Sequence, residues 1–221
     1  MVLSRELRGM IRKPVIFTYH TKYDVEIKRA IQNAVLQKAA ADLLVNNISA
    51  CDEVWAVSHG AGENLRALGY QGDYIVMPNG VDLERGRVSE ESLHALKEAN
   101  DIPEGVPVYL FVGRMMWYKG IRIILDAMQI LKEKQKAFCM IFVGSGMESE
   151  EIKAYAESHG LTDVCRFIGP VYDREEIRRW YCLGDLMLFP SSFDTNGLVV
   201  REASACSLGA VLIKESCSSE G

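Results

Sequence analysis

The chain alternates short runs of β-branched and aromatic residues with longer stretches of helical periodicity, and this alternation constrains its fold more than any other feature. Eight runs have the length and composition of buried strands, at residues 15–19, 53–57, 74–77, 108–112, 138–143, 165–168, 186–189 and 210–213. Strands that alternate with helices are typical of a parallel sheet whose crossover helices cover its faces. The sequence therefore predicts an α/β protein with Rossmann-like parallel sheets.

The stretches between the strands suggest how the chain is organised. One long helix is expected over about residues 25–45, and a second helix should open after Ser58, a good N-cap residue. The polar stretch at residues 84–107 ends in a cluster of Pro and Gly, which is typical of a connection between domains. We therefore expect a partial N-terminal domain with its linker at residues 1–104, and a C-terminal domain at residues 105–221.

Both ends of the chain look incomplete. Only a short helical segment precedes the first strand, and no closing helix follows the last one. Because parallel sheets are normally covered on both faces, we expect the chain to be a fragment of a longer polypeptide, truncated in both domains.

Charge and composition exclude several classes of protein. The 221 residues carry a formal net charge of -5, which argues against a nucleic-acid partner. The six cysteines show no Cys-x-x-Cys pair and no His ligand spacing, so reduced thiols are expected and a zinc site is not. No run is long and apolar enough to predict a signal peptide or a membrane span, which predicts a cytoplasmic protein.

Residues 3–13 add one local exception to the acidic balance. Apolar residues recur there at helical spacing among Arg5, Arg8, Arg12 and Lys13. Such a segment is either an ordinary amphipathic helix packed on its own domain or a contact with an anionic membrane surface. The second interpretation would place the protein peripherally at the inner face of the membrane.

The first candidate site follows the strand at residues 108–112. Gly113 allows close approach to the backbone, while Arg114 and Lys119 can both reach an anion held near the start of the next helix. The alternative is a solvated loop with two ordinary surface cations.

The second candidate site follows the strand at residues 186–189. Asp194 precedes a helix that should start near Gly197, and Glu202 lies inside that helix, where its carboxylate could accept hydrogen bonds from two ribose hydroxyls. The free N–H groups of Gly197, Leu198 and Val199 would meet a diphosphate. The alternative is an N-terminal Asp with a solvated Glu.

Together these segments resemble family 4 of the retaining glycosyltransferases, which have the GT-B fold of two Rossmann-like domains. Gly113-Arg114 with Lys119 looks like the phosphate-binding pair of that family, and the stretch from Asp194 to Glu202 looks like its Glu-x7-Glu motif. Residues 78–82 resemble the segment that leads from the first domain into the second. The resemblance covers the chain from about residue 14 to its end.

The resemblance implies transfer of a sugar from a nucleoside-diphosphate sugar, a UDP-sugar, with retention at the anomeric carbon and without a metal or other cofactor. It implies a catalytic set of Arg114, Lys119, Asp194, Glu202 and His20. It implies donor-binding residues at Gly113, Gly144, Gly146, Val171, Asn196, Gly197, Leu198 and Val199. The first acid of the motif is Asp194 rather than Glu, one methylene shorter, so the donor sugar stays open.

The acceptor is less well defined. Residues 18–21 resemble a segment of family members that glycosylate lipids such as diacylglycerol or phosphatidylinositol, in which the His corresponding to His20 lines the cleft; by itself, a His at a strand end is more typical of structural hydrogen bonding. A sugar or lipid acceptor is therefore expected. Two alternatives stay open: a non-catalytic nucleotide-sugar-binding fragment, and a UDP-sugar epimerase of the same fold. A glycogen-type phosphorylase would need a cofactor lysine that the sequence does not reveal.

Overall fold

The computed structural model describes residues 6, 10 and 13–220, and the chain divides into two compact units. The first unit comprises Met1–Gly80 with Phe193–Asn196 and Glu215–Gly221, and the second comprises Val81–Ser192 with Gly197–Lys214. This division falls earlier than the boundary expected near residue 105. The reason is helix α5 (Glu90–Ala99), which buries Leu93 and Leu96 in the core of the second unit.

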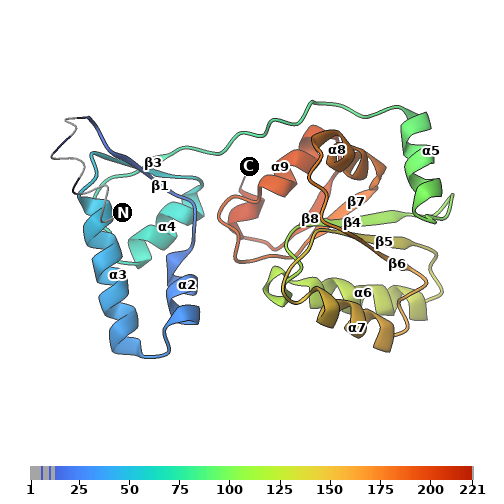
Figure 1. Ribbon diagram of the computed structural model, residues 1–221, viewed down its shortest axis with the longest axis horizontal. Coiled ribbons are helices and arrows are strands. Elements are labelled where there is room, and N and C mark those ends of the chain that lie inside the picture. The colour runs from blue at the N-terminus through green and yellow to red at the C-terminus, as the bar shows by residue number, and fades with distance from the viewer. Residues whose placement is uncertain (1–5, 7–9, 11–12, 221) are drawn as a thin grey trace. The chain divides into compact units, whose positions relative to one another are not determined.

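The first unit is a three-stranded parallel sheet in the order β1-β2-β3. Its strands and helices are β1 (Ile16–Tyr19), α2 (Tyr23–Ala30), α3 (Ala34–Ser49), β2 (Glu53–Ala56), α4 (His59–Ala67) and β3 (Ile75–Val76). Figure 1 shows the three helices together below these strands. Its small core gathers Tyr19, Ile48, Val54 and Leu65.

The single helix predicted over residues 25–45 is wrong, because the chain turns between α2 and α3. Ile31 has an extended backbone, and the Asn33 side chain accepts hydrogen bonds from the N–H groups of Val35 and Leu36, at 2.9 and 3.2 Å. An Asn cap of this kind stabilises a new helix start and competes with continuation of the old one. The predicted Ser58 cap is confirmed, since its Oγ accepts from the N–H of Ala61 at 3.0 Å.

The second unit is a five-stranded parallel sheet in the order β6-β5-β4-β7-β8. Its strands are β4 (Val108–Val112), β5 (Cys139–Val143), β6 (Cys165–Gly169), β7 (Leu186–Phe189) and β8 (Ala210–Leu212). Besides α5, its helices are α6 (Ile121–Glu133), α7 (Ser149–Ser158), α8 (Arg174–Leu183) and α9 (Leu198–Ala205). In Figure 1, α6 and α7 cover one face of the sheet while α8 and α9 cover the other. The eight predicted strands are thus confirmed to within one residue at each end, as is the α/β fold class.

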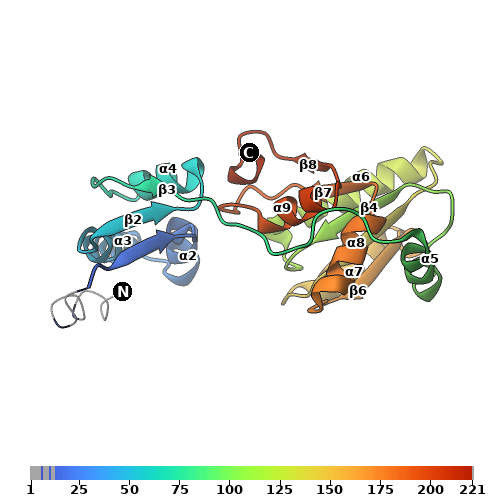
Figure 2. The same ribbon diagram turned by 90° about the horizontal axis from the view of Figure 1, so that it is seen from above.

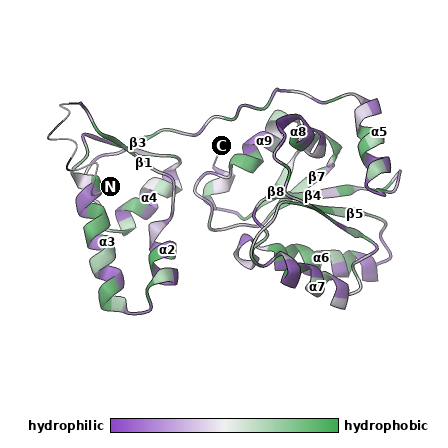
Figure 3. Ribbon diagram, viewed as in Figure 1, coloured by the Kyte–Doolittle hydropathy of each residue, from purple (hydrophilic) through white to green (hydrophobic). Residues whose placement is uncertain are grey.

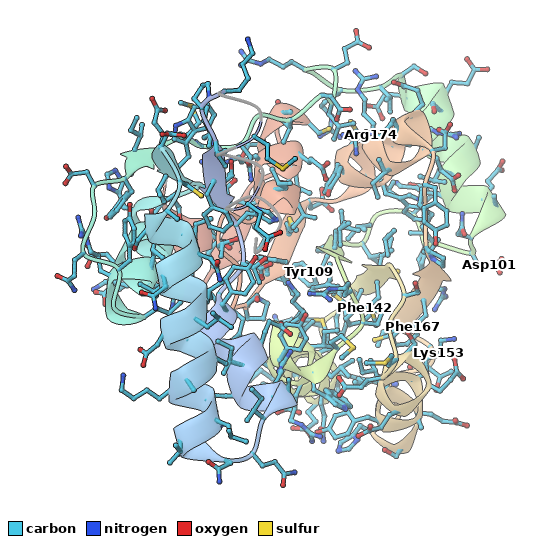
Figure 4. All side chains as sticks on the ribbon, turned by 60° about the vertical axis from the view of Figure 1, so that its left-hand side comes forward. Asp101, Tyr109, Phe142, Lys153, Phe167 and Arg174 are labelled. Atoms are coloured by element: carbon cyan, nitrogen blue, oxygen red, sulfur yellow. The ribbon has the colours of Figure 1, made fainter. Side chains whose placement is uncertain are left out.

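Hydrophobic periodicity explains these layers. Ile121, Ile124, Leu125 and Met128 recur at helical spacing on α6 and are buried, whereas hydrophilic residues gather on the outer sides of α6 and α7 in Figure 3. Every residue of β5 is buried because both faces of this strand are covered. Side chains also stack between strands: the rings of Phe142 and Phe167, labelled in Figure 4, lie 4.9 Å apart.

The topology of the second unit marks one edge of the sheet as a binding edge. The chain starts at the central strand β4, moves outward through β5 to β6, and then returns to the other side of β4 through β7 and β8 (Figure 1); four of these strands, β4, β6, β7 and β8, are also labelled in Figure 2. In sheets of this kind ligands bind at the carboxyl ends of the strands, near the point where the strand order reverses. The order reverses beside β4, between β4 and β7, so a ligand site is expected at the carboxyl edge of the sheet around β4.

The sequence also led to two expectations about membranes, one for an amphipathic segment and one for membrane-spanning helices. The amphipathic segment expected at residues 3–13 lies mostly outside the described residues. Within the part of the chain that the structure describes, no helix is both long and apolar enough to cross a membrane.

The cysteines yield a prediction about reactivity. Five of the six thiols are buried and only Cys51 is partly exposed; burial raises the pKa of Cys165 to about 12 and also raises that of Cys206. Since the thiolate is the reactive form, we expect the folded chain to show one fast thiol toward a disulfide reagent at pH 8 and five slow ones. A Cys51→Ser variant should lose the fast phase, and a fast phase that survives this substitution would contradict the described burial.

Candidate functional site

A pocket of about 290 Å³ opens at the carboxyl ends of β4, β5 and β6 within the second unit. Its walls are formed by Val112, Gly113, Arg114, Val143, Gly144, Ser145, Pro170, Val171, Tyr172, Arg174, Ile177 and Glu202. The first nine of these residues come from the ends of the three strands and the loops that follow them. The last three come from α8 and α9, so the pocket lies at the edge that the strand order singles out.

Backbone hydrogen bonds tie these three loops together. The N–H of Gly113 donates to the carbonyl of Val143 at 3.0 Å, and the N–H of Gly144 donates to the carbonyl of Gly169 at 2.8 Å. The N–H of Met115 donates to the carbonyl of Ser145, also at 3.0 Å. Each loop is thus fixed by its neighbour, and this part of the pocket is preorganised rather than formed on binding.

Close approach of these loops explains the glycines after β5. Gly144 has a φ of +137°, and a Cβ built on it would lie 1.9 Å from the carbonyl oxygen of Gly113. A Cβ on Gly146 would lie 2.3 Å from the carbonyl oxygen of Met115. Side chains at these two positions would therefore push the loops apart. This packing reason for the Gly-x-Gly pattern could not be read from the sequence.

The two cations predicted as a pair approach the same aromatic ring. The guanidinium carbon of Arg114 lies 5.7 Å from the centre of the Tyr118 ring, and the ammonium nitrogen of Lys119 lies 5.4 Å from it. Arg114 is exposed and lines the pocket, whereas Lys119 is only 8% exposed and also lies 5.9 Å from the centre of the Phe189 ring. Such cation–π contacts stabilise a cation in a partly desolvated position.

Glu202 is the carboxylate of the pocket, and two donors hold it. Its side chain is 14% exposed; Oε1 accepts from Nη1 of Arg174 at 3.0 Å, and Oε2 accepts from the hydroxyl of Tyr181 at 2.6 Å. Arg174, seen on α8 in Figure 4, also pairs with Asp82 through Nη2. Burial, followed by the nearby Glu202 carboxylate, raises the pKa of the Tyr181 hydroxyl well above its ordinary value. Tyr181 is therefore a neutral hydrogen-bond donor at any working pH.

Five of the residues predicted from the sequence line this pocket: Gly113, Arg114, Gly144, Val171 and Glu202. Five others belong to the same unit but not to the pocket wall: Lys119, Gly146, Gly197, Leu198 and Val199. The helix predicted to start near Gly197 is confirmed, since Gly197 is the N-cap of α9.

The remaining three predicted residues, His20, Asp194 and Asn196, belong to the first unit. Nδ1 of His20 lies 3.0 Å from the carbonyl oxygen of Thr18, and the backbone carbonyl of His20 accepts from Oγ1 of Thr195 at 2.9 Å. Nδ2 of Asn196 donates to the carbonyl of Val57 at 2.5 Å. These contacts fix the segment Phe193–Asn196 against the carboxyl ends of β1 and β2.

Sequence reasoning missed Arg174 and Tyr181, because both lie on a helix that looks like an ordinary covering helix. Arg174 follows the N-cap Asp173 of α8, and a cation in a first helical turn is unfavourable unless an acid compensates it. Tyr181 is fully buried, and a buried tyrosine hydroxyl needs a partner. The acids Glu175 and Glu176 in the same helical turn could compensate Arg174 as well, so only the fold identifies Glu202 as the shared partner.

Across the described positions, no three His, Cys, Asp or Glu side chains are grouped so that they could hold a metal ion.

Comparison with known proteins gives two family matches. A family model described as "Glycosyl transferases group 1" matches residues 94–220, more than half of the chain. A second model, "Glycosyltransferase Family 4", matches residues 3–85.

Two curated relatives illustrate the sequence similarity. The chain is 33% identical over 156 residues to D-inositol 3-phosphate glycosyltransferase 2 of Catenulispora acidiphila. The aligned segment covers 66% of this chain and 36% of the relative. The chain is 26% identical over 208 residues to alpha-monoglucosyldiacylglycerol synthase of Streptococcus pneumoniae, covering 92% of this chain and 46% of the relative. The chain thus spans less than half the length of these two proteins.

Solved structures share the fold at lower identity, and these structural neighbours are GT-B glycosyltransferases. HepE of Anabaena, solved in complex with UDP and glucose, has a TM-score of 0.80 and 20% identity, covering 98% of this chain and 57% of that protein. Sucrose-phosphate synthase of Thermosynechococcus elongatus has a TM-score of 0.77 and 24% identity, covering 94% of this chain and 52% of that protein.

Proposed function

The chain belongs to the glycosyl transferases group 1 family, and we propose that its second unit binds the nucleoside-diphosphate part of a UDP-sugar. The observation that carries the proposal is the pocket at the carboxyl ends of β4, β5 and β6, which is lined by the cation of Arg114 and the carboxylate of Glu202. A cation suits a diphosphate, and a carboxylate suits a pair of ribose hydroxyls. The UDP bound in the Anabaena neighbour is consistent with the same ligand class.

Each part of the UDP-sugar is assigned to the residues whose chemistry suits it. The diphosphate is assigned to Arg114, with Lys119 and the N–H groups at the start of α9 as further donors. The ribose is assigned to Glu202, and the base to the loop that contains Val171. Tyr172, 87% exposed beside Val171 in the pocket wall, offers an aromatic face to the base.

We further propose that the whole protein transfers the sugar to an acceptor hydroxyl with retention at the anomeric carbon. The bond from the anomeric carbon to the β-phosphate oxygen breaks, a bond to the acceptor oxygen forms, and the acceptor proton leaves with UDP. Arg114 stabilises the charge that develops on the leaving diphosphate, a contribution that is often the largest in such reactions. The reaction as written uses no metal ion or other cofactor.

The first unit is assigned to the acceptor side. One named relative is a D-inositol 3-phosphate glycosyltransferase and the other synthesises alpha-monoglucosyldiacylglycerol, so a sugar or lipid hydroxyl is the proposed acceptor class. His20 is proposed to position the transferred sugar or the acceptor.

Transfer is tested by incubating the whole protein with UDP-glucose, with and without a diacylglycerol or inositol phosphate acceptor. We expect UDP release that depends on the acceptor, and an α-linked product by proton NMR. If the protein binds UDP but forms no UDP from UDP-glucose, a non-catalytic binding module is favoured. If UDP-glucose is converted to another UDP-sugar without an acceptor, an epimerase is favoured. Normal transfer by a His20→Ala variant would remove the proposed role of His20.

Replacing Arg114 with Ala should weaken UDP binding at least about thirtyfold, because charge-assisted hydrogen bonds to the diphosphate are lost. Isothermal titration calorimetry measures the change. The matched control is Lys153→Ala, since Lys153 lies on α7 outside the pocket wall and pairs with Glu150. Equal affinities in the wild type and the Arg114→Ala variant would exclude Arg114 from the donor site.

A further inference from the structure

Helix α8 directs two hydrogen-bond donors toward one carboxylate. Arg174 and Tyr181 are seven residues apart, two helical turns, so they lie on the same side of α8. Each binds a different oxygen of Glu202 on α9: Arg174 binds Oε1 at 3.0 Å and Tyr181 binds Oε2 at 2.6 Å. The orientation of Glu202 is therefore fixed without any ligand.

The two donors differ in their surroundings. Tyr181 is 0% exposed, and its hydroxyl hydrogen bond has little room to rearrange. The side chain of Arg174 is 47% exposed and is shared with Asp82, whose side chain is 82% exposed. Exposed ion pairs exchange partners at little cost, whereas a buried hydroxyl loses its hydrogen bond at a high cost. Tyr181 is thus the permanent donor and Arg174 the exchangeable one.

We propose that Tyr181 is a positioning residue of the donor site, which acts by orienting Glu202 toward the ribose. This inference rests on the proposed function of the pocket. An ionised carboxylate offers about four lone-pair positions. Tyr181 occupies one of them on Oε2 and Arg174 occupies one on Oε1, which leaves one on each oxygen for the two vicinal hydroxyls of a ribose.

A Tyr181→Phe variant separates positioning from packing, because it removes the hydroxyl and keeps the ring in the core. Its affinity is compared with that of the wild type for UDP and for 2′,3′-dideoxy-UDP, which lacks the hydroxyls that Glu202 would accept. We expect the Kd for UDP to rise about tenfold and the Kd for the dideoxy ligand to change less than twofold. The matched control is Tyr155→Phe, which removes a hydroxyl that donates to Asp126 at 2.8 Å outside the pocket wall and should change neither Kd.

Two results with this variant would overturn the inference. Equal losses for both ligands would mean that the hydroxyl only supports the fold, and no loss for either would mean that it does not orient Glu202. A wild type that binds UDP no better than dideoxy-UDP would remove the ribose assignment itself, and a wild type that binds neither would remove the proposed function. The failures of the two proposals are therefore distinguishable.

A second variant carries the test if Tyr181→Phe does not fold. Arg174→Met removes the exchangeable donor from a half-exposed position. Since Tyr181 still holds Glu202 in this variant, the preference for UDP over dideoxy-UDP should stay within about threefold of the wild-type value. Loss of that preference would show that Arg174, rather than Tyr181, orients the carboxylate.

Discussion

Replacing Glu202 with alanine is expected to weaken UDP binding at least about a hundredfold, because two hydrogen bonds from ribose hydroxyls to a charged group are lost. The same change leaves the buried hydroxyl of Tyr181 without its acceptor and frees Arg174 from its ion pair. Isothermal titration calorimetry of the variant and the wild type measures the effect.

The Glu202 prediction has a matched control in Glu150→Ala. Glu150 pairs with Lys153 on α7, and its side chain is 87% exposed, so its removal should leave the Kd unchanged. A Glu202→Gln variant should show a smaller loss, because the amide keeps one acceptor oxygen. A Glu202→Ala variant that folds and binds UDP like the wild type would exclude Glu202 from the donor site.

The second large effect concerns stability rather than binding. Gly144→Ala should lower the free energy of unfolding by at least about 3 kcal/mol, because the new Cβ would lie 1.9 Å from the carbonyl oxygen of Gly113 and the φ of +137° disfavours an L side chain. The clash cannot be relieved by a rotamer change, since the obstructing atom belongs to the backbone. Urea denaturation measures the difference.

The Gly169→Ala variant separates the effect of the steric clash from the effect of the positive φ. Gly169 also has a positive φ, +88°, but a Cβ there meets nothing within 4 Å. We expect a cost of roughly 1–2 kcal/mol, from the backbone conformation alone. If the two variants lose the same free energy of unfolding, the clash between the new Cβ at residue 144 and the Gly113 carbonyl adds nothing to the loss.

Much of the fold could be predicted because its causes are local. Each strand is a compact run of β-branched and aromatic residues, and Ser58 and Gly197 both lie at helix starts where the sequence indicates them. The single helix at residues 25–45 was wrong because Asn33, in a run without Pro or Gly, caps a second helix. Asn33 is a common N-cap residue, but the helical periodicity on both sides of it favoured a single continuous helix.

The site could be predicted only in part, because it is assembled by topology. Arg114 comes two residues after β4, and Glu202 lies on α9, the helix that follows the polar loop after β7, so both could be picked out from the sequence. Arg174 and Tyr181 lie on a helix that looks like an ordinary covering helix, and their importance depends on the position of α9. The membership of Phe193–Asn196 in the first unit is likewise a property of tertiary contacts.

The most direct test of the donor site is isothermal titration calorimetry of the chain with UDP, with UMP and uridine as comparison ligands. Recognition of the diphosphate by Arg114 and of the ribose by Glu202 predicts one-to-one binding of UDP. It also predicts that UMP binds at least about tenfold more weakly and uridine more weakly still. A chain that is folded by circular dichroism and yet binds UDP no better than uridine would contradict the account.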